Sequence, residues 1–246
     1  AHANEYLNHG LVKSGQCMTF TFAVGSNYFF EIAKLKALRI LWKALVQEYD
    51  LSAECHIIAS PSKRNKTLYD YNVNMLRTTS ECMSAVLGGA DTILNLPYDT
   101  VYHKENEFGE RIARNQLLIL KHEGHLDKVE NAADGVYYIE HLTSQLADKA
   151  LTLFKNIEVG GGFLKQLKDG IIQKKIRESA QKEQLLFDEA KEILVGTNKY
   201  ENPEDRMKDA IELYPFVKTD KRKTLIAPIL EKRLADALEQ KRLKNE

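Results

Sequence analysis

The sequence has few cysteines, no excess of charge and no long apolar run. Cys17, Cys55 and Cys82 are widely spaced, odd in number and not arranged as C-x-x-C, which argues against a disulfide framework or a zinc knuckle and favours a reducing cytoplasm. Basic and acidic residues both total 35, so we expect no nucleic-acid partner. No run approaches the roughly 20 apolar residues of a membrane span, and residues 1–10 lack a signal-peptide pattern. We expect a soluble, cytoplasmic protein that does not bind membranes.

The residues that are present indicate alternating strands and helices in a globular chain of 246 residues. The predicted strands are 17–25, 54–60 and 90–96, and the predicted helices are 28–49, 70–87 and 107–123. Ser26 or Asn27 is expected to cap the first helix, and Gly88 or Gly89 to end the second. This alternation is typical of parallel β-α units, which build a barrel or a doubly wound sheet.

Two of these helices carry an apolar face that we expect to be buried. The face of helix 28–49 includes Ile32, Leu35, Leu38, Leu41 or Trp42, and Leu45. The face of helix 107–123 consists of Phe108, Ile112, Asn115 and Ile119. Three parallel strands cannot close a barrel, so the sheet is completed either by strands absent from this sequence or by a partner.

After about residue 124 the pattern becomes mainly helical. We predict a short extended piece at 136–143 and helices over 144–159, 162–194 and 222–246, with breaks at 160–162, at 202–205 and near Pro215. Leu230, Leu234 and Leu238 form a narrow stripe on the last helix, which is either core or a partner seam. We therefore divide the chain into residues 1–124 and 125–246. Studied alone, it is expected to self-associate through its strand edges or this stripe.

The titratable residues do not form a recognisable catalytic set. His122 and His125 have a spacing seen in metal ligands, but such a pair at a helix end is usually a surface pair, so we predict no metal site. Cys55 and His56 are neighbours in a strand and point to opposite faces, so they do not form a dyad, and His56 is expected to be packed or hydrogen-bonded.

The loop 60–66 is the main candidate for ligand binding, because it leaves the carboxyl end of a strand. Ser60, Ser62, Lys63 and Arg64, with Lys66 nearby, could clamp a phosphate-bearing ligand. The alternative is a solvated basic loop, which we favour because no glycine-rich phosphate cradle accompanies it.

Five segments in order resemble the later half of the substrate-binding barrel of the coenzyme B12-dependent acyl-CoA mutases, above all methylmalonyl-CoA mutase. These segments are 27–45, 77–93, 111–123, 135–143 and 193–203. The resemblance implies that the three strands are the sixth, seventh and eighth of a (β/α)8 TIM-type barrel. It also implies a cobalamin domain elsewhere, because the family's D-x-H-x-x-G signature is not in this sequence.

The sequence departs from the family at the polar strand ends. Where catalytic chains carry a pattern close to R-x-H-x-Q-T-S-G, this sequence reads HIIASPSK, with Ile58 in place of the histidine and Ser60 in place of the glutamine. The family's H-T-N on the eighth strand corresponds to LNL. Radical rearrangement depends on the Co–C bond of the cofactor and on polar groups in a closed site.

These departures resemble the small, non-catalytic subunit of the heterodimeric bacterial enzyme. The resemblance implies that the chain is a C-terminal fragment of the barrel domain of this subunit. It implies a large-subunit partner that carries adenosylcobalamin. It also implies that this chain has no catalytic, cofactor-binding or metal-binding residue. The assembly would interconvert methylmalonyl-CoA and succinyl-CoA in propionate metabolism. Two alternatives remain open: a catalytic mutase chain completed by missing strands and a separate cobalamin protein, and a CoA-binding module that uses Ser60, Ser62, Lys63 and Arg64.

Overall fold

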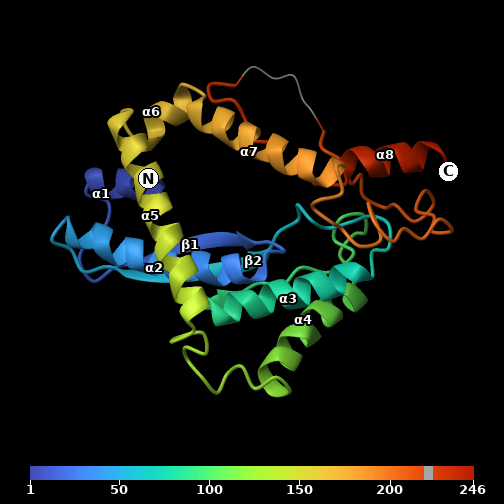
Figure 1. Cartoon of the computed structure of the whole chain (residues 1–246), viewed down its shortest axis with the longest axis horizontal. Helices are drawn as coiled ribbons and strands as arrows, with labels where there is room; N and C mark the ends of the chain where they lie inside the picture. The colour runs from blue at the N-terminus through green and yellow to red at the C-terminus, as the bar shows by residue number, and fades with distance from the viewer. Residues whose placement is uncertain (219–223) are drawn as a thin grey trace.

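The structure, a computed structural model, describes residues 1–218 and 224–246 (Figure 1). Its strands are β1 (Cys17–Val24), β2 (Glu54–Pro61) and β3 (Thr92–Ile93). Its helices are α1 (His2–Asn8), α2 (Tyr28–Gln47), α3 (Val73–Leu87), α4 (Glu107–His122), α5 (Tyr137–Val159), α6 (Phe163–Lys168), α7 (Ile171–Asp188) and α8 (Asp236–Lys244).

The three strands form one parallel sheet in the order β1-β2-β3, which confirms the predicted alternation of parallel strands with helices. In the register, Phe20 of β1 lies opposite Ile57, and Ile58 lies opposite Thr92 of β3. β3 is much shorter than the predicted 90–96. Beyond Leu94 the chain leaves the sheet, because the Asn95 side chain donates to Ala113 O at 2.9 Å and accepts from its neighbour Leu96 N.

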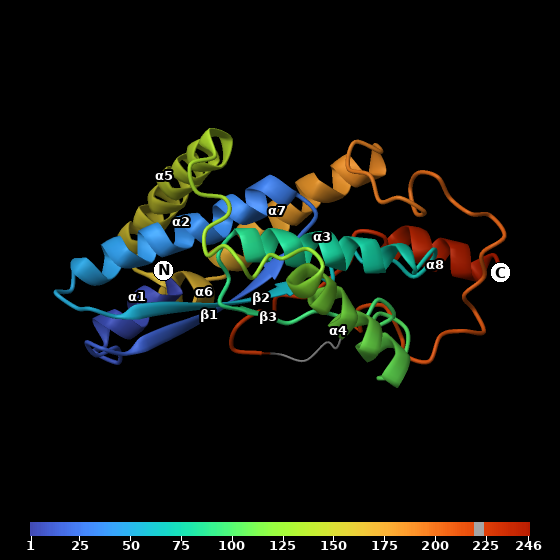
Figure 2. The ribbon, with the colours of Figure 1, turned by 90° about the horizontal axis from the view of Figure 1, so that it is seen from below.

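One face of the sheet carries the core and the opposite face is open on β1. Val24, Leu35, Ile57, Ala59 and Ala85 form a buried cluster between the strands and the helices α2 and α3 (Figure 2). Side chains alternate along β1, so Cys17, Thr19, Thr21 and Ala23 are exposed on its other side. The sheet is therefore covered by helices on one face, and β1 and β3 form its two edges.

The predicted helix signals are confirmed where the chain turns into and out of helices. Asn27 caps α2 by accepting from Phe30 N. Gly89, with a φ of 76°, adopts the left-handed conformation after α3. Gly88 has a different role, because a Cβ there would lie 3.0 Å from Leu35 Cδ1. The pair of glycines therefore ends a helix and also allows α2 to approach α3 closely.

The predicted apolar face of α4 is wrong. The buried residues are Gly109, Ala113, Gln116 and Leu120, whereas Phe108 is 50% exposed and Ile119 is 47% exposed. The rotation has a polar cause, because Gln116 Nε2 donates to Thr78 Oγ1 at 3.0 Å and to Thr79 Oγ1 at 2.7 Å on α3. A small and polar face of α4 thus meets α3, while Phe108 and Ile119 remain half-exposed and Phe108 packs edge-on against Tyr98.

The tail is helical, as predicted, but three boundaries differ. Residues 137–159 form one helix, so the predicted extended piece at 136–143 is wrong; Ile139 of α5 is buried in a cluster with Ile32 of α2. The predicted helix 162–194 is divided at Asp169 and Gly170 into α6 and α7, and α7 ends at Asp188 rather than at residue 194. The break at 160–162 is confirmed, since it separates α5 from α6.

The last helix begins at Asp236, so the predicted helix 222–246 is wrong over residues 224–235, while residues 222 and 223 lie outside the described residues. Pro228 lies inside the predicted helix and cannot supply a backbone N–H. Leu230 is exposed in an irregular segment and Leu234 is buried just before α8, so they do not share a stripe with Leu238.

Figure 1 shows α6 and α7 as an arch on the side of the molecule opposite α3 and α4. Among residues 1–218 and 224–246, no helix has the length and apolar character that crossing a membrane would require.

Candidate functional site

The carboxyl ends of β1 and β2 form the part of the sheet where ligand sites of parallel β-α folds usually lie. The loop after β2 begins here, and Ser62 N donates to Val24 O at 2.7 Å, which ties the start of the loop to the end of β1. Ser60 is half-buried in β2, opposite Ala23. The predicted candidates therefore do lie at this edge.

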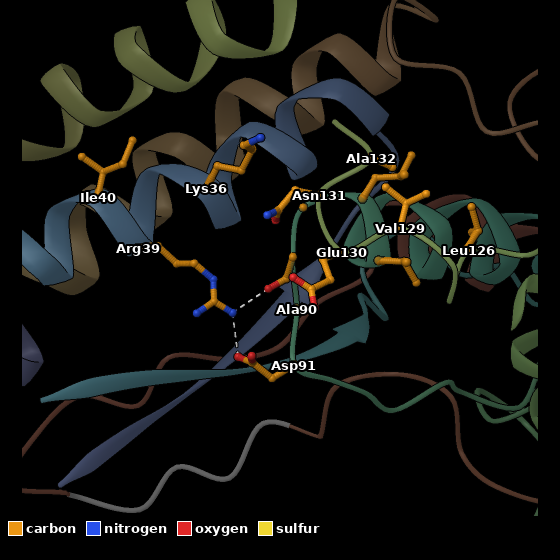
Figure 3. A pocket seen from close by; sticks show the side chains of 14 residues that line it. Lys36, Arg39, Ile40, Ala90, Asp91, Leu126, Val129, Glu130, Asn131 and Ala132 are labelled. Atoms are coloured by element: carbon orange, nitrogen blue, oxygen red, sulfur yellow. Dashed lines mark hydrogen bonds and ion pairs between the residues drawn. The ribbon is translucent and has the colours of Figure 1, made fainter. Parts of the chain in front are cut away.

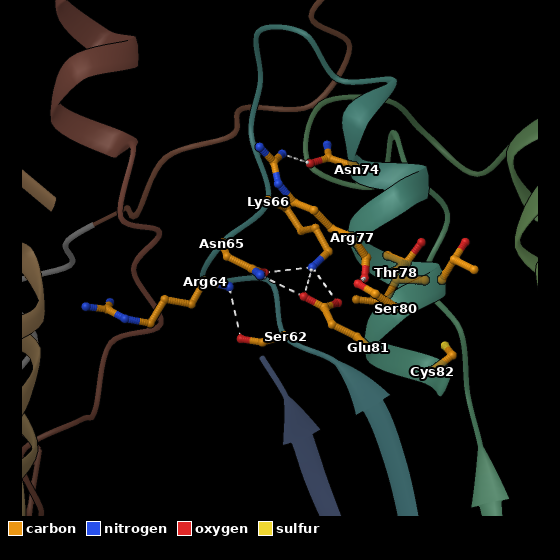
Figure 4. Close-up of polar contacts among 12 residues, drawn as sticks. Ser62, Arg64, Asn65, Lys66, Asn74, Arg77, Thr78, Ser80, Glu81 and Cys82 are labelled. Atoms are coloured by element: carbon orange, nitrogen blue, oxygen red, sulfur yellow. Dashed lines mark hydrogen bonds and ion pairs between the residues drawn. The ribbon is translucent and has the colours of Figure 1, made fainter. Parts of the chain in front are cut away.

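The loop residues do not converge on a common point. The side chain of Lys63 is exposed to solvent. Ser62 Oγ accepts from Arg64 N at 3.1 Å, while the Arg64 side chain points away from Lys66 (Figure 4). Arg64 pairs with Glu183 of α7 and donates to Lys232 O at 2.8 Å. Its charge is thus matched within the chain, and the phosphate clamp remains a prediction.

Lys66 and Glu81 form a buried ion pair behind this loop (Figure 4). Their side chains are 2% and 1% exposed, and Lys66 Nζ lies 2.7 Å from Glu81 Oε2. Asn65 completes the cluster, since its Nδ2 donates to Glu81 Oε1 at 2.7 Å and its Oδ1 accepts from Lys66 Nζ at 2.7 Å. Burial raises the pKa of Glu81 and lowers the pKa of Lys66, while their mutual attraction opposes both shifts. Each charge is therefore tolerated because of the other.

A second set of hydrogen bonds holds the loop against α3. Asn74 accepts from Thr67 N at 3.1 Å and donates to Thr67 O at 2.9 Å. Its side-chain amide thus satisfies both backbone groups of Thr67. Arg77 donates to Thr67 Oγ1 at 2.8 Å and to Val195 O at 2.7 Å. The loop is thereby joined both to α3 and to the segment after α7.

The buried position of Glu81 was not predicted from the sequence, and Lys66 was expected among the cations of a solvated loop. A signal was present, because Thr78, Glu81, Cys82 and Ala85 share one face of α3 and all are buried. A carboxylate on the core face of an amphipathic helix implies a buried cation as its partner. Lys66 is the basic residue of the loop that meets this requirement.

The cysteine and histidine residues near the sheet are packed or hydrogen-bonded within the fold. His56 Nε2 lies 3.0 Å from Thr92 Oγ1, so the prediction of a hydrogen-bonded histidine is confirmed. Cys55 packs with the core cluster on the helix-covered face. Burial raises the pKa of the Cys55 thiol to about 11 and that of the Cys82 thiol to about 12, so both stay neutral near pH 7. Across the two described ranges, no group of three or more His, Cys, Asp or Glu residues could hold a metal.

A cavity of about 550 Å³ lies at the opposite, amino end of the strands, between α2 and the turn before β3 (Figure 3). Arg39 lines it and donates to Cys55 O at 3.0 Å, to Gly89 O at 2.6 Å and to Asp91 Oδ2 at 2.7 Å. Lys36 pairs with Asp134. Both cations are paired with carboxylates of the chain, and these ion pairs link the elements around the cavity. Neither cation is therefore free to bind an anion.

Asp91 is expected to stabilise the fold in a pH-dependent way. Burial by itself would raise the pKa of Asp91, but the Ile57 N–H and the Arg39 guanidinium outweigh burial and lower it. A carboxyl with a lowered pKa stabilises the folded state above its unfolded pKa of about 3.9, and this contribution is lost as the pH falls through the folded value. The stability difference between wild type and Asp91→Asn should therefore shrink as the pH falls from about 5 through the unfolded pKa and below it.

Urea unfolding at stepped pH measures that difference. Asp209→Asn, which removes an exposed carboxylate, is the control. A constant gap between wild type and Asp91→Asn over this range would contradict the assignment.

The sequence matches the family described as methylmalonyl-CoA mutase over residues 4–244. It is 43% identical over 199 residues to the methylmalonyl-CoA mutase small subunit of Porphyromonas gingivalis, covering 79% of this chain and 32% of that protein. It is 32% identical over 202 residues to the methylmalonyl-CoA mutase large subunit of the same organism, covering 80% and 28%. It is 36% identical over 227 residues to a methylmalonyl-CoA mutase of Rhizobium meliloti, covering 87% and 31%. The chain thus spans about a third of the length of these curated relatives.

Proposed function

The chain belongs to the methylmalonyl-CoA mutase family, and from this premise we propose that it is part of a small, non-catalytic subunit of a coenzyme B12-dependent methylmalonyl-CoA mutase. It associates with a large subunit that carries the cofactor and the reacting groups. The assembly interconverts methylmalonyl-CoA and succinyl-CoA. The identity to the small subunit of P. gingivalis, 43%, exceeds the 32% identity to the large subunit of the same organism, which supports this choice.

We infer that β1, β2 and β3 are neighbouring strands of a (β/α)8 barrel. The parallel order of the strands, the uncovered face at Thr19 and Thr21, and the half-exposed apolar residues Phe108 and Ile119 all support a sheet that continues into further strands and helices. Residues 1–124 are the barrel part, and residues 125–246 are a helical extension that packs on it. The contact of α5 with α2 supports this division.

The non-catalytic assignment rests on one observation: the charged side chains at the carboxyl end of β2 form ion pairs with other residues of this chain. Arg64 is paired with Glu183, and Lys66 is paired with Glu81. A site that binds an acyl-CoA needs polar groups directed at the ligand, whereas these groups are directed at the protein itself. Ile58 and Ser60 replace polar residues of the catalytic pattern in the same strand.

Adenosylcobalamin is assigned to the large subunit. When bound there, it supplies the radical through its Co–C bond. This assignment is supported by the pairing of the polar residues here within the chain: at the carboxyl end of β2 the side chains of Asn65, Lys66 and Glu81 contact one another, and His56, near the amino end of β2, lies 3.0 Å from Thr92 Oγ1. The role of this chain is to complete the fold of its partner complex.

Reconstitution tests the proposal. The full-length protein that contains this chain is mixed with adenosylcobalamin and methylmalonyl-CoA, with and without the large subunit from the same source. We expect a one-to-one complex and succinyl-CoA formation with the large subunit, and neither bound corrin nor turnover without it. A corrin absorption spectrum or product formation by the small subunit alone would overturn the proposal.

The same preparation distinguishes the CoA-binding alternative. A phosphate clamp would require Arg64 to leave Glu183, so calorimetric titration with CoA should show millimolar affinity or none. Lys63→Ala combined with Arg64→Ala should leave any weak binding unchanged. Micromolar binding that these substitutions abolish would favour the clamp.

A further inference from the structure

The segment 232–246, which we call the C-terminal strap, crosses the loop after β2 and includes α8. The strap lies between the end of α7 and this loop, and Figure 1 shows α8 beginning beside the end of α7. The loop and the strap are separated by more than 150 residues in sequence. Their contacts are therefore a product of the tertiary structure.

The strap satisfies backbone groups of the loop along its length. Leu234 N donates to Arg64 O at 2.9 Å, and Arg233 Nη1 donates to Lys66 O at 3.1 Å. Glu239 Oε1 accepts from Leu68 N at 2.7 Å. Since an unpaired buried backbone group costs about as much as a lost hydrogen bond, the closed loop depends on the presence of the strap.

The strap also brings buried charges that compensate one another. Arg233 lies 3.0 Å from Asp236 and 2.6 Å from Glu239, and the three side chains are 7%, 4% and 0% exposed. Arg233 and Glu239 both bond the loop backbone, so this charge cluster joins the strap to the loop. The cluster lies beside the Lys66–Glu81 pair, because Arg233 donates to the carbonyl of Lys66 itself.

Apolar and aromatic contacts seat the strap on either side of these charges. Leu234 and Ala235 are buried with Phe187 and Leu194 at the end of α7. The Arg242 guanidinium lies 3.8 Å from the ring centre of Tyr69, which is a cation–π contact with the loop. The strap is thus held by α7 on one side and by the loop on the other.

We propose that the C-terminal strap is a latch that holds residues 62–70 closed over the Lys66–Glu81 pair, and that its release opens this loop as a unit while the sheet stays folded. The core under the sheet consists of Val24, Leu35, Ile57, Ala59 and Ala85, and the strap contributes none of these residues. The two regions therefore have separate sets of contacts and can open independently. A ligand or partner that engages this loop must first displace the strap. The latch does not depend on the proposed function.

Hydrogen exchange measured by mass spectrometry tests the latch in wild type and in Glu239→Gln. The substitution replaces the carboxylate that pairs with Arg233 and accepts from Leu68 N by a neutral amide. Exchange of the amides in residues 64–69 should therefore become about 10- to 100-fold faster, the factor expected when a hydrogen bond to a charged group is lost. Exchange in β2 should be unchanged. Lys241→Met is the matched control on the same helix, because Lys241 is exposed, and it should leave both regions unchanged.

Unchanged exchange in residues 64–69 would overturn the latch, and so would an equal acceleration in residues 54–61, which would mean that loop and sheet open together. If Glu239→Gln does not fold, Arg233→Lys is measured in its place. Lysine keeps the charge but cannot bond two carboxylates and a carbonyl in the same geometry, so we expect a smaller acceleration confined to residues 64–69. Acceleration spread over the sheet would again contradict the proposal.

Discussion

Lys66→Met is expected to lower the free energy of unfolding by about 3–5 kcal/mol, because it leaves the Glu81 carboxylate buried without its cation. Glu81 is 1% exposed, so water cannot replace the lost ammonium group. Asn65 can still donate one hydrogen bond to Glu81, which offsets part of the cost. The expected loss is a large fraction of the total stability of a typical domain.

Urea unfolding followed by circular dichroism measures this change. The matched control is the double variant Lys66→Met with Glu81→Leu, which removes both charges and should recover most of the lost stability. Lys63→Met, three residues earlier and exposed, should change stability by less than about 0.5 kcal/mol. A double variant as unstable as Lys66→Met would show that packing, rather than the unpaired charge, causes the loss.

Leu35→Ala is expected to cost about 2–5 kcal/mol through lost burial and an unfilled cavity. Leu35 is fully buried in the core cluster on α2, between the sheet and α3. It also meets the turn after α3, where Gly88 permits its close approach. Truncating Leu35 therefore removes contacts with the sheet, with α3 and with the turn after α3.

Ile40→Ala provides the comparison on the same helix, because Ile40 is 54% exposed. Its substitution should change stability by no more than about 0.5 kcal/mol. Thermal and urea unfolding of both variants measure the difference. If Ile40→Ala destabilised the protein as much as Leu35→Ala, the assignment of the core face of α2 would be wrong.

Both predictions concern the part of the molecule that is proposed to act as scaffold. Leu35 lies under the sheet and Lys66 at its carboxyl end, so together they probe the two sets of contacts that the latch model separates. Leu35→Ala should accelerate hydrogen exchange in β2, whereas a change in the strap should act on residues 62–70.

The sequence alone determined the elements with the strongest periodicity. The predicted strand 17–25 and helix 28–49 correspond closely to β1 and α2, because alternation and three- to four-residue spacing of apolar side chains report directly on burial. The glycine stop after α3 and the break at 160–162 were also readable, since glycine adopts a positive φ without the strain that other residues meet there. The family resemblance came from the same segments.

Only the tertiary structure decided which polar groups are buried and which apolar groups are not. α4 turns its small and polar face to α3 because Gln116 finds hydroxyl partners there, and local spacing contains no record of those partners. Lys66 became half of a buried pair because Glu81 faces it from the middle of α3. Residues 224–235 are not helical, because Pro228 interrupts the pattern and residues 232–234 bond a loop far away in sequence, where Arg233 and Leu234 meet Arg64 and Lys66. The position of Glu81 on the core face of α3 indicates a buried cation, but hydrogen bonds and ion pairs between distant segments leave no periodic pattern in a single sequence. The partners of these groups could therefore be found only in the folded chain.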